Sequence, residues 1–552
     1  MRRMHARWMV SVTAAMMTAV GLAVALAAAP AALAAPVLPS QDPFYSYGGA
    51  LTNLAPGAVL RTRSVTIAES GNATPVTATQ VLYRTTGQLD QPTVTVATII
   101  RPAVTVAPVK IVSYQTAYDA LGSQCDPSYT LQGGNSSYST AQDEEQIILG
   151  YVAAGDTVVI PDYEGEKLDW AAGQESGYDT LDAIRAAEHL LGVPARTTPV
   201  GMVGYSGGSI ATDMAGELAG TYAPELDIVG AAEGGIPADY FHNLTYINGS
   251  TGWAGVIPAV LVSLSRAYDI SFQQYLSPYG QQVTGQVQSE CINSFAGNYP
   301  GLTIQQLLKP QYQDYTKIHD LVAIGDHMIM SRTGTPRGPL FMGVGDSDGT
   351  GDGIMVTADD EGLAHTYCQR GVSVQFNVYS GADHTQAAVP FEAGAAQFLA
   401  QRLAGLPVPN GCGSIGAGNS LAPLPVPAAV TVTGAGPRRR GPGRRALTFS
   451  FGAGRRCVRG LVLHLASVHG TLTHVVVTLS RGRRRVALRR IGRLTRRRRQ
   501  LILTTRGHAP SAGRYTLRVS EGGLTLLTRT VRVRGRAACT RTPARTGPRF
   551  TG

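Results

Sequence analysis

Apolar and polar positions alternate with two different periods along the chain. Several β-branched runs bounded by Gly and Pro are typical of strands joined by hairpins, and they cover residues 59–67, 77–85, 93–100 and 110–115. From residue 156 an apolar run leads to apolar residues at helical spacing from Tyr178 to Leu191, then to another apolar run at 199–203. Antiparallel strands followed by alternating strands and helices predict an α/β sheet that is parallel in its later half. Ligands bind such sheets where the strands end, so strand-end residues are the candidates for chemistry.

A glycine-rich turn follows the last of these runs and reads Gly204-Tyr205-Ser206-Gly207-Gly208. This G-x-S-x-G pattern between a strand and a helix is typical of a serine nucleophile, because small neighbours let a strained turn close and a substrate approach. The alternative is an ordinary glycine-rich turn whose serine has no special role. Residues 345–349 also fit the pattern, but they continue into loop sequence and place acids beside Ser347, so we do not expect a nucleophile there.

Two more candidate residues follow apolar strands later in the chain. The strand predicted at 339–344 leads into an acidic loop, and the strand at 372–379 leads to His384 and a helix from about residue 391 to 403. The order serine, acid, histidine is the one that α/β-hydrolases use, because an imidazole takes the serine proton and a carboxylate orients the imidazole. We expect Asp348 to be the acid, with two nearby carboxylates as competitors, Asp346 and Asp352. The same three carboxylates leave a cation-binding loop as an alternative.

The N-terminus and the cysteines indicate an exported protein. Arginines precede an apolar run that ends at Ala32-Leu33-Ala34, so residues 1–34 are predicted to be a signal peptide, with an uncleaved membrane anchor as the alternative. None of the six cysteines lies in a C-x-x-C pair, which favours disulfides over a metal site. Position along the chain favours three pairs: Cys125 with Cys291, Cys368 with Cys412, and Cys457 with Cys539.

The net charge of +10 conceals two oppositely charged parts. From residue 431 onward the chain has 29 arginines and one acid, Glu521, a balance of +28 that leaves −18 for the rest. The Gly-, Pro- and Arg-rich stretch 413–445 is typical of a linker, short alternating strands predict a small β-sandwich at 446–540, and a tail follows at 541–552.

Arginines in such number attract anionic polymers and membrane surfaces, so the C-terminal part is a candidate anchor to the cell envelope. The alternative is a solvated sandwich that rests on the acidic body. We expect no nucleic-acid partner, because this part has no named nucleic-acid motif.

Together the motifs resemble the secretory lipase family of the α/β-hydrolase superfamily, to which Candida lipase A and actinobacterial members belong. The resemblance covers about residues 40–412 and rests on the serine turn, the Asp348 and His384 turns, and four further stretches: Asp42 to Tyr45, Gln80 to Thr86, Pro161 to Gly165, and Ala231 to Asp239. It implies an α/β-hydrolase catalytic domain at 35–412 that hydrolyses acylglycerols or related lipid esters without a cofactor or metal.

The resemblance also implies an oxyanion hole and a cap. The family places the oxyanion donors at the amide after the nucleophile, here Gly207, and at an Asp after an early strand, which matches Asp119; a plain turn or N-cap role is the alternative for Asp119. Far more residues separate Ser206 from Asp348 than the roughly 30 that a βαβ unit needs. This spacing predicts a helical cap inserted at about 240–320 with an apolar underside for acyl chains, or else a plain helical subdomain.

These features predict a secreted serine lipase or esterase that works through Ser206, Asp348 and His384 by way of an acyl-enzyme. Two alternatives stay open: an envelope acyltransferase or peptidase on the same fold, and a non-catalytic envelope-binding protein. The complete set of serine, acid and histidine favours the enzyme.

Overall fold

The computed structural model describes residues 35–69, 72–104, 107–134 and 143–427, together with seven strands between residues 447 and 533. The predicted signal peptide at 1–34 and the predicted pair of Cys457 with Cys539 lie outside the described residues. Within the described ranges, no helix has the length and apolar character that crossing a membrane requires.

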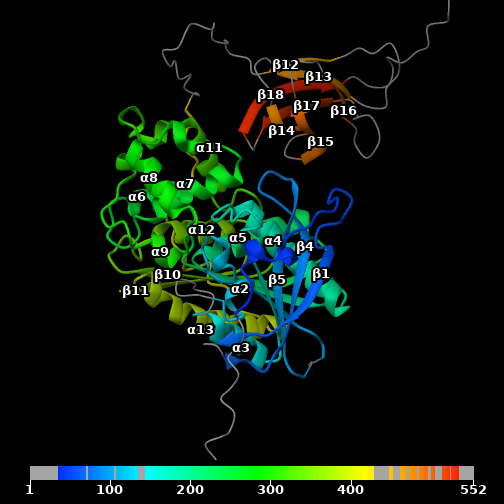
Figure 1. Ribbon diagram of the computed structural model, residues 1–552, viewed down its shortest axis with the longest axis vertical. Coiled ribbons are helices and arrows are strands. Elements are labelled where there is room, and N and C mark those ends of the chain that lie inside the picture. The colour runs from blue at the N-terminus through cyan, green and yellow to red at the C-terminus, as the bar shows by residue number, and fades with distance from the viewer. Residues whose placement is uncertain are drawn as a thin grey trace, which may run out of the picture.

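A nine-stranded mixed sheet forms the centre of the protein (Figure 1). Its strands lie side by side in the order β1 (Val59–Val65), β4 (Thr77–Thr86), β5 (Pro92–Arg101), β7 (Thr157–Pro161), β6 (Ile111–Gln115), β8 (Pro199–Tyr205), β9 (Asp227–Gly234), β10 (Leu340–Asp346) and β11 (Val374–Ser380). The pairings from β1 to β7 are antiparallel, and those from β7 to β11 are parallel. The predicted α/β sheet, parallel in its later half, is confirmed. A separate short hairpin joins β2 (Ala68–Glu69) to β3 (Asn72–Ala73).

Helices cover both faces of the sheet. One face packs against α4 (Gly173–Leu191), α5 (Gly207–Tyr222) and α12 (Thr357–Gln369), whose buried side chains include Leu181, Met214 and Leu363. The other face packs against α3 (Glu145–Ala153) and α13 (His384–Leu403), with Ile148 and Phe391 in a second core. Figure 1 shows α3 and α13 on the side away from α4 and α5. Because both faces are covered, the strand ends are where functional side chains gather.

Helix α13 begins earlier than residue 391, where the sequence predicts its start. Asp383 caps it, because its carboxylate accepts from the Gln386 amide over 2.9 Å while the Gln386 side chain accepts from the Asp383 amide over 3.1 Å. Pro390 lies inside the helix. The N-cap Asp383 therefore fixes His384, the residue that follows it, at the first position of the helix.

The chain between β9 and β10 forms the predicted helical cap, drawn mainly in green in Figure 1. Its α-helices are α6 (Tyr240–Tyr246), α7 (Val256–Ala267), α8 (Pro278–Val287), α9 (Ile292–Phe295), α10 (Ile304–Leu307) and α11 (His319–Met328). The cap also contains the 3₁₀ turns Phe272–Gln274, Pro310–Tyr312 and Tyr315–Lys317. Short helices outside the cap are α2 (Pro127–Thr130) and the 3₁₀ turns Pro39–Gln41, Pro43–Tyr45 and Ser123–Cys125. Two of the predicted disulfides are confirmed, Cys125–Cys291 and Cys368–Cys412.

The described C-terminal strands form two antiparallel sheets, in agreement with a sandwich-like domain. One sheet has the order β12 (Leu447–Phe451), β13 (Leu461–Ser467), β16 (Arg499–Leu503), and the other β15 (Arg484–Leu494), β14 (Leu472–Arg481), β17 (Gly513–Glu521), β18 (Leu524–Val533). Along β17, Tyr515, Leu517 and Val519 are buried while Arg514 and Arg518 are exposed. This period of two gives β17 one buried apolar face and one exposed face that carries both arginines.

Candidate active site

Ser206 lies in a tight turn between β8 and α5, with backbone angles φ 55° and ψ −122° that L-residues rarely adopt. The turn closes because its glycines leave room: a Cβ on Gly204 would collide with the backbone carbonyl of Gly208. The Ser206 amide donates to the Gly234 carbonyl at the end of β9 over 2.8 Å. Ser206 is partly exposed, although the residues on either side of it are buried. The strained turn therefore presents its hydroxyl at the ends of the parallel strands.

His384 brings an imidazole to this hydroxyl. Its Nε2 lies 2.8 Å from Ser206 Oγ, and the residue is 4% exposed. The Tyr205 hydroxyl donates to the backbone carbonyl of His384 over 2.7 Å. Trp253, from the cap, packs edge-on against the imidazole with ring centroids 5.5 Å apart. His384 is therefore held by Tyr205 of β8 and by Trp253 of the cap.

Asp352 is the carboxylate that reaches the histidine. Its Oδ2 lies 2.7 Å from His384 Nδ1, and the residue is 1% exposed. Its Oδ1 accepts from the backbone amides of Ile354 over 3.0 Å and Met355 over 2.7 Å, and its carbonyl accepts from the His384 amide over 2.9 Å. Hydroxyl, imidazole and carboxylate thus follow one another in the order that lets a proton pass from the serine to the histidine.

Asp348, the acid that the sequence favours, is wrong as the partner of His384. Its Oδ1 accepts from the amides of Thr350 over 2.8 Å and Gly351 over 2.9 Å, and its Oδ2 accepts from the Tyr246 hydroxyl over 2.8 Å. The hydrogen bonds from the Gly351 and Thr350 amides lower the pKa of this exposed carboxyl below its usual value.

The length of the loop after β10 explains this difference. The loop runs outward to an exposed tip, where the Asp346 carboxylate accepts from the Gly349 amide over 2.8 Å, and returns through a bridge between Gly351 and Val356. The carboxylate that comes back to the sheet edge is therefore Asp352 and not one nearer to the strand. The three carboxylates of the loop face different partners.

Asp119 lies beside Gly207 at the start of α5. It is 4% exposed and has a backbone φ of 38°, and a Cβ on Gly207 would overlap the Asp119 Oδ1. Within the described residues this oxygen has no hydrogen-bond partner. Burial raises the pKa of the Asp119 carboxyl to about 7, against the lowering effects of the Trp170 indole and of His384. The Gly207 amide is at the start of α5, where amides have no intrahelical acceptor. The Gly207 backbone and the Asp119 carboxyl lie side by side. Each can donate a hydrogen bond, the carboxyl when it is protonated.

The cap holds the Asp119 loop in place. The disulfide between Cys125 and Cys291 joins the two segments. The Ile292 amide donates to the Asp119 carbonyl over 3.0 Å, and the Leu121 amide donates to the Glu290 carbonyl over 2.9 Å. The position of the Asp119 side chain therefore depends on cap residues that are distant in sequence.

Known proteins share this architecture and its sequence motifs. A family model described as secretory lipase matches residues 132–411. This chain belongs to the secretory lipase family. "Lipase A" of Arthroderma benhamiae is 33% identical over 412 residues, which are 69% of this chain and 83% of that protein. A Mycobacterium tuberculosis protein with the name "Probable inactive lipase MT1628" is 34% identical over 385 residues, 68% of this chain and 84% of that one.

The solved structure of Candida antarctica lipase A in its closed state is similar to this secretory lipase along most of its length. The two superpose with a TM-score of 0.64 at 30% identity, over 73% of this chain and 93% of that chain. Membership of the family makes the protein a carboxylic ester hydrolase that acts outside the cell. The C-terminal sheets lie beyond the matched residues.

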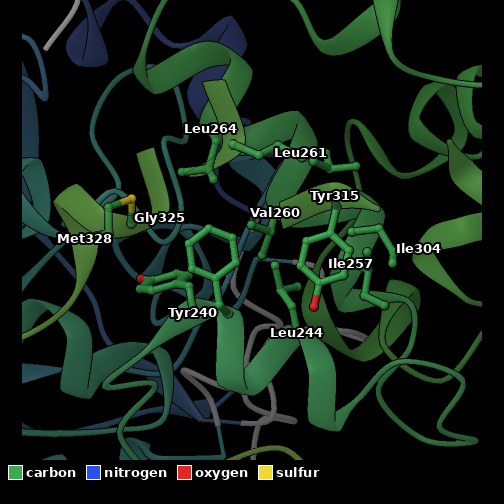
Figure 2. Close-up of a pocket in the computed structure, with 12 residues that line it drawn as sticks. Tyr240, Leu244, Ile257, Val260, Leu261, Leu264, Ile304, Tyr315, Gly325 and Met328 are labelled. Carbon is green, nitrogen blue, oxygen red and sulfur yellow. The ribbon is translucent and has the colours of Figure 1, made fainter. Parts of the chain in front are cut away.

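The cap of this secretory lipase contains an apolar hollow (Figure 2). It occupies about 460 Å³, counting the part open to solvent. Tyr240 and Leu244 of α6 line it together with Leu261 of α7 and Met328 of α11. Burial raises the pKa of Tyr240, and the neighbouring Tyr268 and Asp119 add to the shift. Asp119 is therefore within electrostatic range of Tyr240, one of the residues that line the hollow.

The sequence does not predict the positions of two site residues. Asp352 is only a competitor of Asp348 there, and Trp253 has no expected contact with His384. Asp352 has a weak local signal, since it stands between Gly351 and Gly353, and Gly353 has a φ of 103°. A carboxylate between two glycines in a strand-end loop is compatible with a sharp return of the chain. Trp253 has no local signal, because its contact with His384 depends on how the cap folds over the sheet.

Proposed function

We propose that this secretory lipase hydrolyses lipid esters through Ser206, His384 and Asp352. Ser206 Oγ attacks the ester carbonyl carbon while His384 Nε2 takes the hydroxyl proton, and the resulting intermediate collapses when His384 returns that proton to the leaving alcohol. Water then gives a proton to His384 and attacks the acyl-serine carbonyl carbon, and His384 returns that proton to Ser206 Oγ as the fatty acid leaves. The observation that carries the proposal is the pair of contacts at 2.8 Å and 2.7 Å that joins the three side chains.

The proposed oxyanion donors are the Gly207 amide and the protonated Asp119 carboxyl. A carboxylate would repel the developing negative charge, whereas a carboxylic acid donates a hydrogen bond to it. The pKa of Asp119, raised by burial to about 7, keeps the acid form populated up to neutral pH. We therefore expect the pH profile of kcat to decrease as the pH rises above about 7.

The hollow in the cap is the proposed site of the acyl chain. Its lining is apolar, and Asp119 is within electrostatic range of Tyr240, which lines it. Leu244→Trp would fill part of it, so kcat/KM for p-nitrophenyl palmitate should decrease at least about tenfold while that for p-nitrophenyl butyrate changes less than about twofold. An equal change for both esters would place the acyl chain elsewhere.

Two serines that fit the same motif provide the test of the nucleophile. Ser206→Ala should abolish hydrolysis of p-nitrophenyl butyrate, whereas Ser347→Ala should retain it, because the Ser347 hydroxyl donates to the Gly351 carbonyl over 3.1 Å in the exposed loop. Full activity in Ser206→Ala would refute the proposal. Cleavage of peptides, or acyl transfer to an alcohol in preference to water, would favour the peptidase or acyltransferase; no turnover of any ester would favour a binding protein.

We also propose that the C-terminal sheets hold the enzyme near anionic cell-envelope surfaces. The supporting observations are the 29 arginines against one acid from residue 431 onward and the exposed Arg514 and Arg518 of β17. Sedimentation with phosphatidylglycerol vesicles should exceed that with phosphatidylcholine vesicles and should weaken with salt. Arg514→Glu with Arg518→Glu should reduce it. Equal sedimentation with both lipids would favour the alternative, a solvated sandwich that rests on the acidic body. The ion pair between Arg490 and Asp90 at 3.4 Å supports that alternative.

A further inference from the structure

Helix α6 contacts two functional regions with different side chains. Tyr240 and Leu244 line the apolar hollow. Asn243 and Tyr246 instead reach the loop that carries Asp352. The Asn243 side-chain amide, which is buried, donates to the Ile354 carbonyl over 2.8 Å. The first helix of the cap thus touches both the hollow and the loop of the acid.

Tyr246 makes two hydrogen bonds with this loop. Its hydroxyl donates to Asp348 Oδ2 over 2.8 Å and accepts from the Gly353 amide over 3.0 Å. The other oxygen of Asp348 accepts from the Gly351 amide over 2.9 Å. Asp352 therefore lies between two peptide groups that are joined through one chain of contacts, from Gly351 through Asp348 and Tyr246 to Gly353.

We infer that Tyr246 is a positioning residue for Asp352, and that Asn243 and Asp348 support it in this role. The cap helix thereby sets where the carboxylate stands relative to His384. Glycines flank Asp352 on both sides, so the local backbone has wide conformational freedom unless outside contacts restrict it. A displacement of about 1 Å in a catalytic group can cost on the order of a hundredfold in rate. Asp348 has a role under this inference, although it does not bind the histidine.

The inference rests on the proposed function, and the test compares two equivalent tyrosines. Tyr246→Phe removes only the hydroxyl that joins α6 to the loop. Tyr275→Phe is the matched control, because the Tyr275 hydroxyl also donates to a carboxylate, Asp320 Oδ2, over 2.7 Å elsewhere in the cap. With active sites counted by fluorophosphonate labelling, we expect Tyr246→Phe to lower kcat for p-nitrophenyl butyrate about tenfold with KM changed less than about twofold, and Tyr275→Phe to leave both unchanged.

The turnover of each labelled site provides a readout that a general loss of stability would not move. Unfolding lowers the number of sites that the fluorophosphonate labels, whereas a displaced Asp352 lowers the kcat of each labelled site. We expect the number of labelled sites to stay the same in Tyr246→Phe and Tyr275→Phe, and only Tyr246→Phe to lose kcat per site.

Asp348→Ala is the second variant, because its side chain is exposed and its loss should not prevent folding. We expect it to lower kcat about threefold alone and to add little in the Tyr246→Phe background, since both changes interrupt the same chain of contacts. If the wild type depends on Ser206 but both variants keep its kcat, the inference is wrong while the proposed function stands. If Ser206→Ala keeps activity, the proposed function itself fails.

Discussion

The nucleophile turn and the acid loop follow β8 and β10, the two strands on either side of β9, but they are held in different ways. Ser206 is fixed by its immediate neighbours: a strained backbone, the small residues around it and the helix that starts directly after it. Asp352 depends on residues far away in the sequence, since Asn243 is 111 residues from the carbonyl that it binds and Tyr246 is 107 residues from the amide that it binds.

This difference determines how each part of the site can change. A turn built from contiguous residues keeps its geometry wherever the strand and helix are present. A loop held by an inserted cap takes its geometry from the cap, so changes in α6 reach the histidine through Asp352. Of the two, the acid loop is the place where substitutions outside the site should tune the rate.

The largest effect should come from removing the charge of the acid. Asp352→Asn should lower kcat/KM about 10⁴-fold, because an amide holds His384 in the wrong tautomer and does not stabilise its cation. Asp348→Asn is the matched control four positions away and should change kcat/KM less than about fivefold, since it supports the loop and does not touch the imidazole. A larger loss of kcat/KM in Asp348→Asn than in Asp352→Asn would show that Asp348 is the acid.

The same contrast shows how far the sequence could lead. The mixed sheet, the serine turn, His384 and two disulfides follow from local signals: β-branched runs, the G-x-S-x-G pattern, a strand before the histidine and the order of the cysteines. The choice among Asp346, Asp348 and Asp352 depends on how the loop returns through the Gly351–Val356 bridge, which tertiary contacts from α6 decide. The expected start of α13 near residue 391 is too late, because the helix begins at His384 after its N-cap Asp383 and continues through Pro390.

The next effect tests the turn itself. Gly207→Ala would place a methyl group against the Asp119 carboxyl, so we expect kcat to decrease about a hundredfold through loss of the oxyanion site. Gly285→Ala in α8 is the control, because a Cβ there meets nothing within 4 Å. It should leave kcat unchanged and stabilise the helix by about 0.5 to 1 kcal/mol. Equal kcat in Gly207→Ala and Gly285→Ala would show that Asp119 is not part of the oxyanion site.

A smaller effect on the rate should follow from opening the disulfide that ties the Asp119 loop to the cap. Cys125→Ala with Cys291→Ala should lower both the melting temperature and kcat, the latter on the order of tenfold, because the loop loses a fixed end. Cys368→Ala with Cys412→Ala removes a disulfide away from Asp119 and should lower the melting temperature alone. Retained kcat in the first pair would show that hydrogen bonds suffice to hold the loop.

The smallest effect on turnover should come from the buried carboxyls of Glu233 and Glu392, which instead change the stability of the fold with pH. Burial raises the pKa of Glu233, which pairs in register with Gly204, to about 8, and that of Glu392 in α13 to about 7. The folded state therefore keeps protons that the unfolded state has lost above about pH 4.5, so these groups stabilise the fold at low pH and that stability is lost as the pH rises towards 8.

Thermal unfolding at pH 5.5 and pH 8.5 measures this dependence. We expect the higher melting temperature at pH 5.5, and a weaker dependence in Glu233→Gln, which keeps the neutral shape and cannot ionise. His327 acts in the opposite sense, because burial lowers its pKa. An unchanged slope in Glu233→Gln would mean that Glu233 does not carry the effect.

Acid-quench mass spectrometry of the enzyme mixed with p-nitrophenyl palmitate tests the central mechanism most directly. If Ser206 is the nucleophile, the quenched wild type carries one palmitoyl group, peptide mapping places it on Ser206, and Ser206→Ala carries none. A palmitoyl group on another residue, or turnover by the wild type with no acylated protein, would contradict the mechanism.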